Sequence, residues 1–145
     1  MKDRKGNSRS TFATLGASTH SDHNREENDY YATDPKAAKL LLDIEPELTD
    51  IWEPACGDGH LAGVFAEYNK LAAATDLIDR GYGKPNVDFL QSSHHHNGDI
   101  VTNPPFRYAL EFAQKSLDLI PEVRKVAMFL RIQFLEGKAR RKFFD

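Results

Sequence analysis

Apolar positions recur along the chain with helical spacing and, between those stretches, in short uninterrupted runs. The first stretch has a clear start, because Asp34 is a good N-cap and Pro35 suits the first helical position. Glu45-Pro46 then ends this helix near Ile44. In all, four segments show the spacing of a helix with one apolar face, over residues 35–44, 61–68, 109–120 and 137–144.

Five short apolar runs lie between these helices and predict strands over residues 51–55, 72–76, 87–89, 99–103 and 125–131. Strands that alternate with helices favour a parallel sheet with right-handed crossovers. The predicted fold class is therefore α/β, with a doubly wound, mainly parallel sheet. Residues 1–28 are polar and show no sustained periodicity, so we expect a flexible arm followed by one domain over residues 29–145.

Composition narrows the class of protein. The 145 residues are 40% hydrophobic, which is too many for a disordered chain. No run approaches the about 18 apolar residues of a spanning helix, and the first residues lack the apolar run of a signal peptide. A single cysteine cannot form an internal disulfide. We therefore expect a soluble, cytoplasmic protein with no membrane partner, and the sequence leaves its oligomeric state open.

Charge is distributed unevenly. The net charge of −3 excludes a broadly basic nucleic-acid binder. Residues 121–145 nevertheless carry seven basic and three acidic groups, against seven and 15 in residues 29–120. The basic end is either a solvated helix face or a patch that faces phosphate groups. Its candidate phosphate contacts are Arg131, Lys138, Arg140, Arg141 and Lys142.

A glycine turn, residues 56–59, follows the first predicted strand and opens the next helix. Gly57, Gly59 and Ala62 have the spacing of a dinucleotide fingerprint, with Asp76 at the end of the next strand as the ribose acceptor. The simpler interpretation is close packing of a helix on a strand. Glu53 and Asp58 beside the turn would repel a pyrophosphate and attract an ammonium and a sulfonium. The acids favour S-adenosylmethionine over NAD.

The most specific motif is Asn103-Pro104-Pro105-Phe106, at the end of the fourth predicted strand. The prolines donate no hydrogen bonds and hold the backbone extended, so the Asn103 oxygen and the Pro104 carbonyl can converge on one amino group. Two acceptors on an aromatic amine favour the tetrahedral geometry that frees its lone pair for methylation. Phe106 would stack on a base turned out of a duplex. The alternative is a strand end closed by a Pro-Pro turn.

Smaller signals have mostly structural interpretations. Three adjacent histidines at 94–96 lie in a polar loop and do not make a preorganised metal site, so no metal is expected. Cys56 lies in the glycine turn rather than in the fourth-strand motif, which argues against cytosine-C5 methylation by a thiolate. Trp52 and Tyr68 are expected in the core. For Tyr30 and Tyr31, the sequence leaves two interpretations equally open, packing in the core and contact with the cofactor.

These motifs resemble those of the class I S-adenosylmethionine-dependent amino-methyltransferases. Glu53-Pro-Ala-Cys-Gly-Asp-Gly59, Asp76, Asp88-Phe89 and Asn103-Pro-Pro-Phe106 are similar to its motifs I to IV. Within that class the sequence is most similar to the phage and prophage DNA adenine-N6 methyltransferases. Tyr31-Ala-Thr33-Asp-Pro35 resembles the family motif that encloses the methionine moiety, and residues 126–137 are similar to its fifth strand.

The resemblance implies a role for each matching residue. Glu53, Pro54, Ala55, Gly57 and Gly59 would hold the methionine part of the cofactor, with Tyr31 and Thr33 enclosing it. Asp76 would bind the ribose hydroxyls, and Asp88 the adenine amino group, with Phe89 beside the ring. Asn103 and Pro104, with Pro105, would hold the target amine, and Phe106 would stack on the target base. The implied partners are DNA and S-adenosylmethionine in a bacterial or phage-infected cell.

The sequence departs from the family in two ways. The family's sheet has seven strands, whereas this sequence accounts for five, so we expect a domain that is incomplete at its C-terminus. The stretch from Gly57 to Asn103 leaves no room for a separate target-recognition segment. The leading hypothesis is adenine-N6 methylation of DNA. The alternatives are methylation of cytosine N4, RNA or a protein glutamine, or an inactive remnant that binds the cofactor without turnover.

Overall fold

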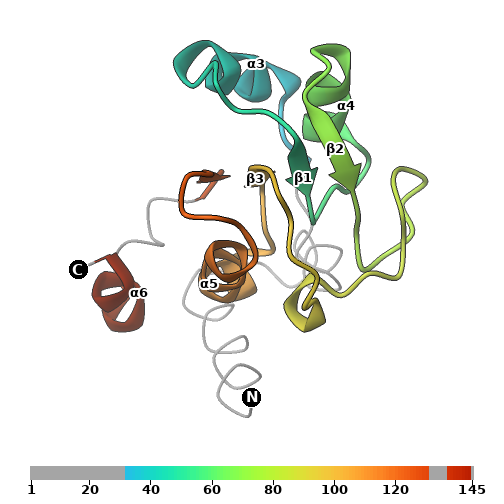
Figure 1. Cartoon of the computed structure of the whole chain (residues 1–145). Coiled ribbons are helices and arrows are strands. Elements are labelled where there is room, and N and C mark those ends of the chain that lie inside the picture. Colours follow the sequence, from blue (N-terminus) through green and yellow to red (C-terminus); the bar gives the residue numbers. More distant parts are fainter. Residues whose placement is uncertain (1–31, 131–136, 145) are drawn as a thin grey trace.

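The computed structural model describes residues 32–130 and 137–144 (Figure 1). The predicted arm over residues 1–28, together with Tyr30, Tyr31 and Arg131, lies outside the described residues. The described helices are α3 (Pro35–Ile44), α4 (His60–Glu67), α5 (Ala109–Leu119) and α6 (Lys138–Phe144), with short 3-10 helices η1 (Phe89–Gln91) and η2 (Phe106–Tyr108). All four predicted helices are confirmed. Asp34 caps the first as expected, by accepting the Lys36 N–H at 2.9 Å.

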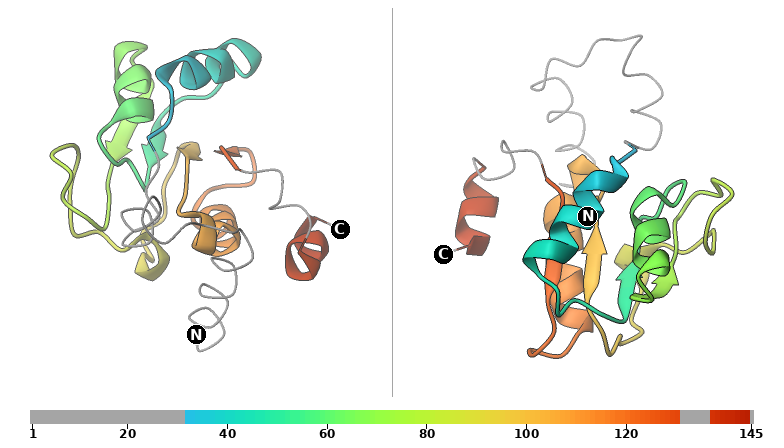
Figure 2. Two further views of the ribbon diagram at one scale, coloured as in Figure 1. Left: turned by 180° about the vertical axis from the view of Figure 1, so that it is seen from behind. Right: turned by 90° about the horizontal axis from the view of Figure 1, so that it is seen from above.

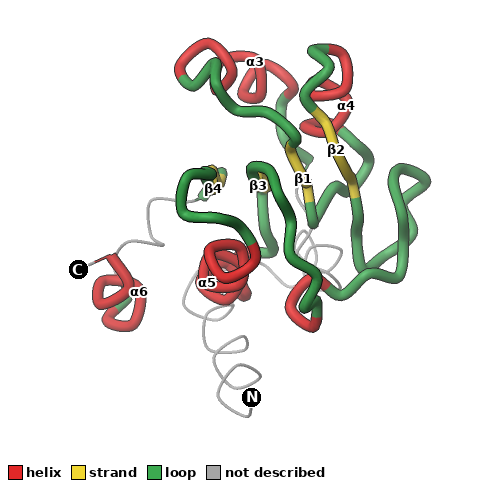
Figure 3. Tube along the Cα trace, in the orientation of Figure 1, coloured by secondary structure: helices red, strands yellow, loops and turns green. Residues whose placement is uncertain are grey.

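The described strands form one parallel sheet in the order β2-β1-β3-β4. They are β1 (Ile51–Glu53), β2 (Leu71–Ala74), β3 (Ile100–Thr102) and β4 (Val126–Met128) (Figure 3). The chain adds β2 on one side of β1 and then returns to add β3 on the other side. The strand order therefore reverses between β1 and β3, where open α/β sheets bind ligands beyond the carboxyl ends of their strands.

The third predicted strand, over residues 87–89, is wrong. Val87 and Asp88 are irregular, and Phe89 begins the 3-10 helix η1. The Asp88 side chain accepts the Leu90 N–H at 3.1 Å, and this local bond favours a turn over a strand. The described residues thus contain four strands, each shorter than expected. β1, for example, ends at Glu53 because Pro54 has no N–H to donate.

Two apolar layers cover the two faces of the sheet and confirm the doubly wound α/β class. Ile51 and Val101 pack with buried residues of α3 and α4 on one face. Trp52 and Ile100, the alternate positions of the same strands, pack with α5 and η1 on the other. Figures 1 and 2 show α3 and α4 side by side, with α5 across the sheet from them. The apolar layers leave the carboxyl strand ends as the place for polar chemistry.

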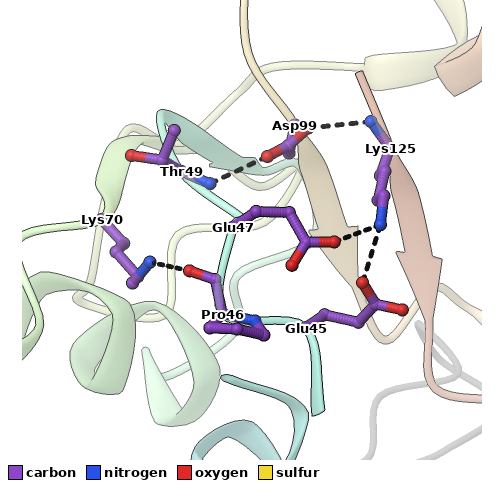
Figure 4. Close-up of polar contacts among 7 residues, drawn as sticks. All are labelled: Glu45, Pro46, Glu47, Thr49, Lys70, Asp99 and Lys125. Carbon is purple, nitrogen blue, oxygen red and sulfur yellow. Dashed lines mark hydrogen bonds and ion pairs between the residues drawn. The ribbon is translucent and has the colours of Figure 1, made fainter. Parts of the chain in front are cut away.

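The amino ends of the strands are closed by a separate polar cluster (Figure 4). The carboxylate of Asp99, which is buried, accepts the backbone N–H groups of Thr49 and Lys125, each at 2.8 Å. The Lys125 ammonium contacts Glu45 at 2.7 Å and also Glu47. These acids join the segment before β1 to the starts of β3 and β4. They hold the fold together at the end of the sheet opposite the candidate site.

Among residues 32–130 and 137–144, no helix combines the length and the apolar character that crossing a bilayer requires.

Candidate functional site

Glu53 occupies the carboxyl end of β1 and is only 2% exposed. Its Oε2 accepts hydrogen bonds from the Thr102 hydroxyl at the end of β3 and from the Ala55 N–H, both at 2.8 Å. Burial raises the pKa of Glu53 to about 8, the two donors lower it in part, and the nearby charge of Asp76 raises it. At pH 7 this carboxyl group is therefore mostly protonated. Pro54 is buried directly after it.

The glycine turn reaches across to the end of β2. Gly57 and Gly59 have φ values of 54° and 90°, which glycine adopts without strain. The Gly57 N–H donates to Oδ2 of Asp76 at 2.8 Å, and Oδ1 of Asp76 accepts the Ile78 N–H at 3.0 Å. A carboxylate has about four acceptor positions, so these two bonds leave Asp76 able to accept ligand hydroxyls as well. Asp76 thus lies at the glycine turn, next to the exposed side chain of Leu77.

The Asn-Pro-Pro-Phe motif follows β3 directly. Nδ2 of Asn103 donates to the hydroxyl of Thr33 at 2.6 Å, so the segment before α3 meets this motif. Pro104 is buried, and Pro105 is half-buried with a φ of −54°. The ring of Phe106 is 8% exposed, at the start of η2. Stacking this ring on a base therefore requires the ring or its surroundings to move.

Asp88 and Phe89 lie on the chain that leaves β2. The Val87 N–H donates to the backbone carbonyl of Asp76 at 3.0 Å, which brings the exposed Asp88 to the same end of the sheet. Phe89 is 2% exposed and packs edge-on against Trp52, with ring centroids 5.1 Å apart. The side chain of Phe89 therefore belongs to the apolar core, and Asp88 is the member of this pair that solvent reaches.

Two residues of the site were missed by sequence reasoning. Thr102 carries no signal beyond its place before Asn103. Tyr82 lies between two glycines, a turn signal, but nothing in the sequence links it to the glycine turn. Its ring lies so close to Gly59 that a Cβ on Gly59 would come within 2.5 Å of Tyr82 Cδ2.

Of the two aromatic residues expected in the core, Trp52 is buried and Tyr68 is exposed. Trp52 is 6% exposed, and its indole N–H donates to the Thr75 hydroxyl at 3.0 Å. Tyr68 is 49% exposed, so its expected core position is wrong. It follows the last turn of α4 as the C-cap, where the helical spacing no longer turns its side chain toward the core.

The remaining candidates from the sequence are structural or peripheral. His94 and His95 are exposed, whereas Nε2 of His96 lies 2.7 Å from the Asp50 carbonyl oxygen. In the part of the chain that the structure describes, no three His, Cys, Asp or Glu residues gather as a metal site would require.

Burial raises the pKa of the Cys56 thiol to about 12, so it stays protonated. Arg141 and Lys142 on α6 are exposed.

The carboxyl strand ends thus bring together a glycine turn, the acids Glu53, Asp76 and Asp88, and a proline-flanked amide. This set offers acceptors for hydroxyl, ammonium and amino groups. Asp76 and Asp88, unlike the mostly protonated Glu53, oppose a phosphate ligand. Comparisons with known protein families, with curated proteins and with solved structures found no match for this chain.

Proposed function

We propose that this chain binds S-adenosylmethionine at the glycine turn and transfers its methyl group to the N6 amine of adenine in DNA. The proposal rests above all on one relationship. The Thr102–Glu53 hydrogen bond joins the strand end that precedes the glycine turn to the strand end that precedes Asn103. A cofactor on the turn and an amine at Asn103 would then be neighbours.

The chemistry of the glycine turn supports this cofactor. Asp76 already orders the turn through the Gly57 N–H, and its remaining acceptor positions suit a ribose diol. The exposed side chain of Leu77 offers apolar surface beside it for a purine ring. The cofactor carries an ammonium and a sulfonium, whereas a dinucleotide would bring a pyrophosphate close to the exposed Asp58 in the turn. Glu53, which is mostly protonated at pH 7, adds little to this repulsion. The charge of Asp58 therefore favours the cationic ligand.

The amine would be held at the Asn-Pro-Pro-Phe motif. Because Nδ2 of Asn103 donates to Thr33, the orientation of the amide is set and Oδ1 is its acceptor for an amino hydrogen. The Pro104 carbonyl supplies the second acceptor. The amine lone pair forms a bond to the methyl carbon, the carbon–sulfur bond breaks with its electrons moving to sulfur, and water takes the surplus proton. Correct placement of the two reactants accounts for most of the expected acceleration.

DNA contact is proposed from the exposed cations Arg141 and Lys142 of α6, which suit phosphate groups. The low exposure of Phe106 favours a second candidate, in which the chain binds the cofactor without turnover. The same two acceptors at the Asn-Pro-Pro-Phe motif could also hold the amino group of cytosine N4, of RNA or of a protein glutamine.

An assay with radiolabelled S-adenosylmethionine on DNA, RNA and protein substrates tests the proposal. We expect label in adenine of DNA, and its loss in Asn103→Ala with cofactor affinity within a few fold of wild type. Asn97→Ala removes an exposed asparagine from the loop before β3 and serves as the matched control. Unchanged transfer by Asn103→Ala would remove the assigned role. Cofactor binding without product on any substrate would favour the second candidate.

A further inference from the structure

Residues 81–84, here called the strap, run beside the end of β2 after the chain has left the sheet. The Lys84 N–H donates to the Ala74 carbonyl at 2.9 Å, and the Asp76 N–H donates to the Lys84 carbonyl at 3.0 Å. Thr75 and Lys84 form an isolated parallel bridge. The strap is therefore fastened to the same segment that carries Asp76, the candidate ribose acceptor.

The strap packs directly on the glycine turn. Three ring atoms of Tyr82 lie 2.5–2.7 Å from where a Cβ of Gly59 would be. The Cys56 thiol donates to the Tyr82 carbonyl oxygen over 3.5 Å. Gly83 has a φ of +68°, and a Cβ there would come within 2.5 Å of the Ala74 carbonyl oxygen and 2.9 Å of Cys56 Sγ. Side chain and backbone of the strap thus both contact the turn.

The glycine turn needs such support. Gly59 is the N-cap of α4 and makes no side-chain capping bond, because glycine has no side chain to offer. Glycines at positive φ also have more conformations open to them than other residues. A bulky ring that lies on Gly59 restricts those conformations by excluded volume alone. Tyr82 is half-buried, so its ring lies at the border between the turn and solvent.

We infer that Tyr82 is a positioning residue, which holds the glycine turn in the conformation that binds the cofactor. This inference rests on the proposed function for the identity of the ligand, but the hold on the turn can be measured without any ligand. Cys56 is the chain's one cysteine, is 4% exposed and lies under the strap, so its reactivity reports whether the strap has lifted.

The experiment measures the rate at which an aromatic disulfide reagent labels Cys56, together with calorimetric titration by S-adenosylmethionine. Variants are Tyr82→Ala, Tyr82→Leu and Tyr82→Phe, with Tyr68→Ala as the control because Tyr68 is an exposed tyrosine at the C-cap of α4. We expect labelling to rise about ten-fold or more in Tyr82→Ala, since the opened strap is then more populated. Cofactor affinity should fall by a similar factor. Tyr82→Phe keeps the ring, so it should keep the labelling rate and the affinity at their wild-type values, and Tyr68→Ala should change neither.

Wild-type labelling and wild-type cofactor affinity in Tyr82→Ala would overturn the inference. Faster labelling with undiminished affinity would also overturn it, because the strap would then lift without affecting the ligand. If Tyr82→Ala does not fold, Tyr82→Leu removes the ring but keeps a bulky apolar side chain, so labelling should rise and affinity should fall by smaller factors. Wild-type values of both in Tyr82→Leu would then overturn the inference. If wild type binds no S-adenosylmethionine, the proposed function fails, and the labelling rates alone decide whether Tyr82 holds the turn.

Discussion

The hydroxyl group of Thr102 donates a hydrogen bond to the buried carboxyl group of Glu53, 2.8 Å away. These residues end β3 and β1, the two neighbouring strands between which the order of the sheet reverses. One is followed by the Asn-Pro-Pro-Phe motif and the other by the glycine turn. This side-chain hydrogen bond therefore joins the two halves of the candidate site.

Removing the hydroxyl should destabilise the fold. Thr102→Val leaves Oε2 of Glu53 with the Ala55 N–H as its only described donor, in a place that water does not reach. We expect the free energy of unfolding to fall by about 1–3 kcal/mol in urea denaturation. Thr102→Ser keeps the hydroxyl and should lose much less. Equal stability of Thr102→Val and wild type would show that the bond contributes nothing.

The stability of the chain should depend on pH through Glu53. Its pKa is about 8 in the fold and near 4.5 when unfolded, so between these values the folded chain keeps a proton that the unfolded chain has lost. Stability is therefore lost as pH rises from 4.5 to 8, by up to about 1.4 kcal/mol per pH unit from this group.

Glu53→Gln isolates this effect, because the amide stays neutral and keeps an acceptor for Thr102. We expect the variant to gain stability relative to wild type steadily from pH 5 to pH 8, as followed by urea denaturation at each pH. Subtracting the two profiles cancels the other titrating groups. Parallel profiles would mean that Glu53 is ionised in the fold at neutral pH.

Thr33 should matter for transfer more than for cofactor binding. Its hydroxyl accepts from Nδ2 of Asn103 at 2.6 Å, and without it the amide can rotate away from the orientation proposed for the amine. For Thr33→Val we expect kcat on DNA to fall about ten-fold, with the KM for S-adenosylmethionine within a few fold of wild type. Thr33→Ser retains the hydroxyl and should keep near-normal turnover. A loss confined to KM would instead place Thr33 at the cofactor.

Asp76 should matter for cofactor binding. Asp76→Ala removes the acceptor for the Gly57 N–H as well as the proposed ribose acceptor. We expect the affinity for S-adenosylmethionine, measured by calorimetry, to weaken about ten-fold or more. Asp43→Ala removes an exposed acid from α3 and should leave affinity unchanged. Wild-type affinity in Asp76→Ala would remove Asp76 from the ribose site.

Local signals predicted the elements of this fold well, and remote contacts account for what was missed. Asp34-Pro35 predicts the start of α3 because both effects act within one turn of the chain. Residues 87–89 look like a strand by composition, yet the Asp88 side chain accepts the backbone N–H of Leu90, two residues further on, and this bond bends the chain. The apolar pattern alone therefore could not show that a turn would form here instead of a strand.

In the candidate site, too, local signals predicted some features and remote contacts account for the rest. The glycine turn and Asp76 meet as the fingerprint spacing predicts, because both follow strands that are neighbours in the sheet. The Thr102–Glu53 bond joins residues 49 apart, and the Cys56–Tyr82 contact joins residues 26 apart. Threonine in a strand and tyrosine in a loop are common, so neither residue signals a distant partner. Only the folded arrangement brings them to the site.

Calorimetric titration of the purified chain with S-adenosylmethionine, with NAD as the control ligand, tests the central claim most directly. The account predicts micromolar binding of S-adenosylmethionine and no binding of NAD, whose pyrophosphate Asp58 in the glycine turn would repel. Circular dichroism of the same sample establishes that the chain is folded. A folded chain that binds NAD, or that binds no S-adenosylmethionine, would contradict the account.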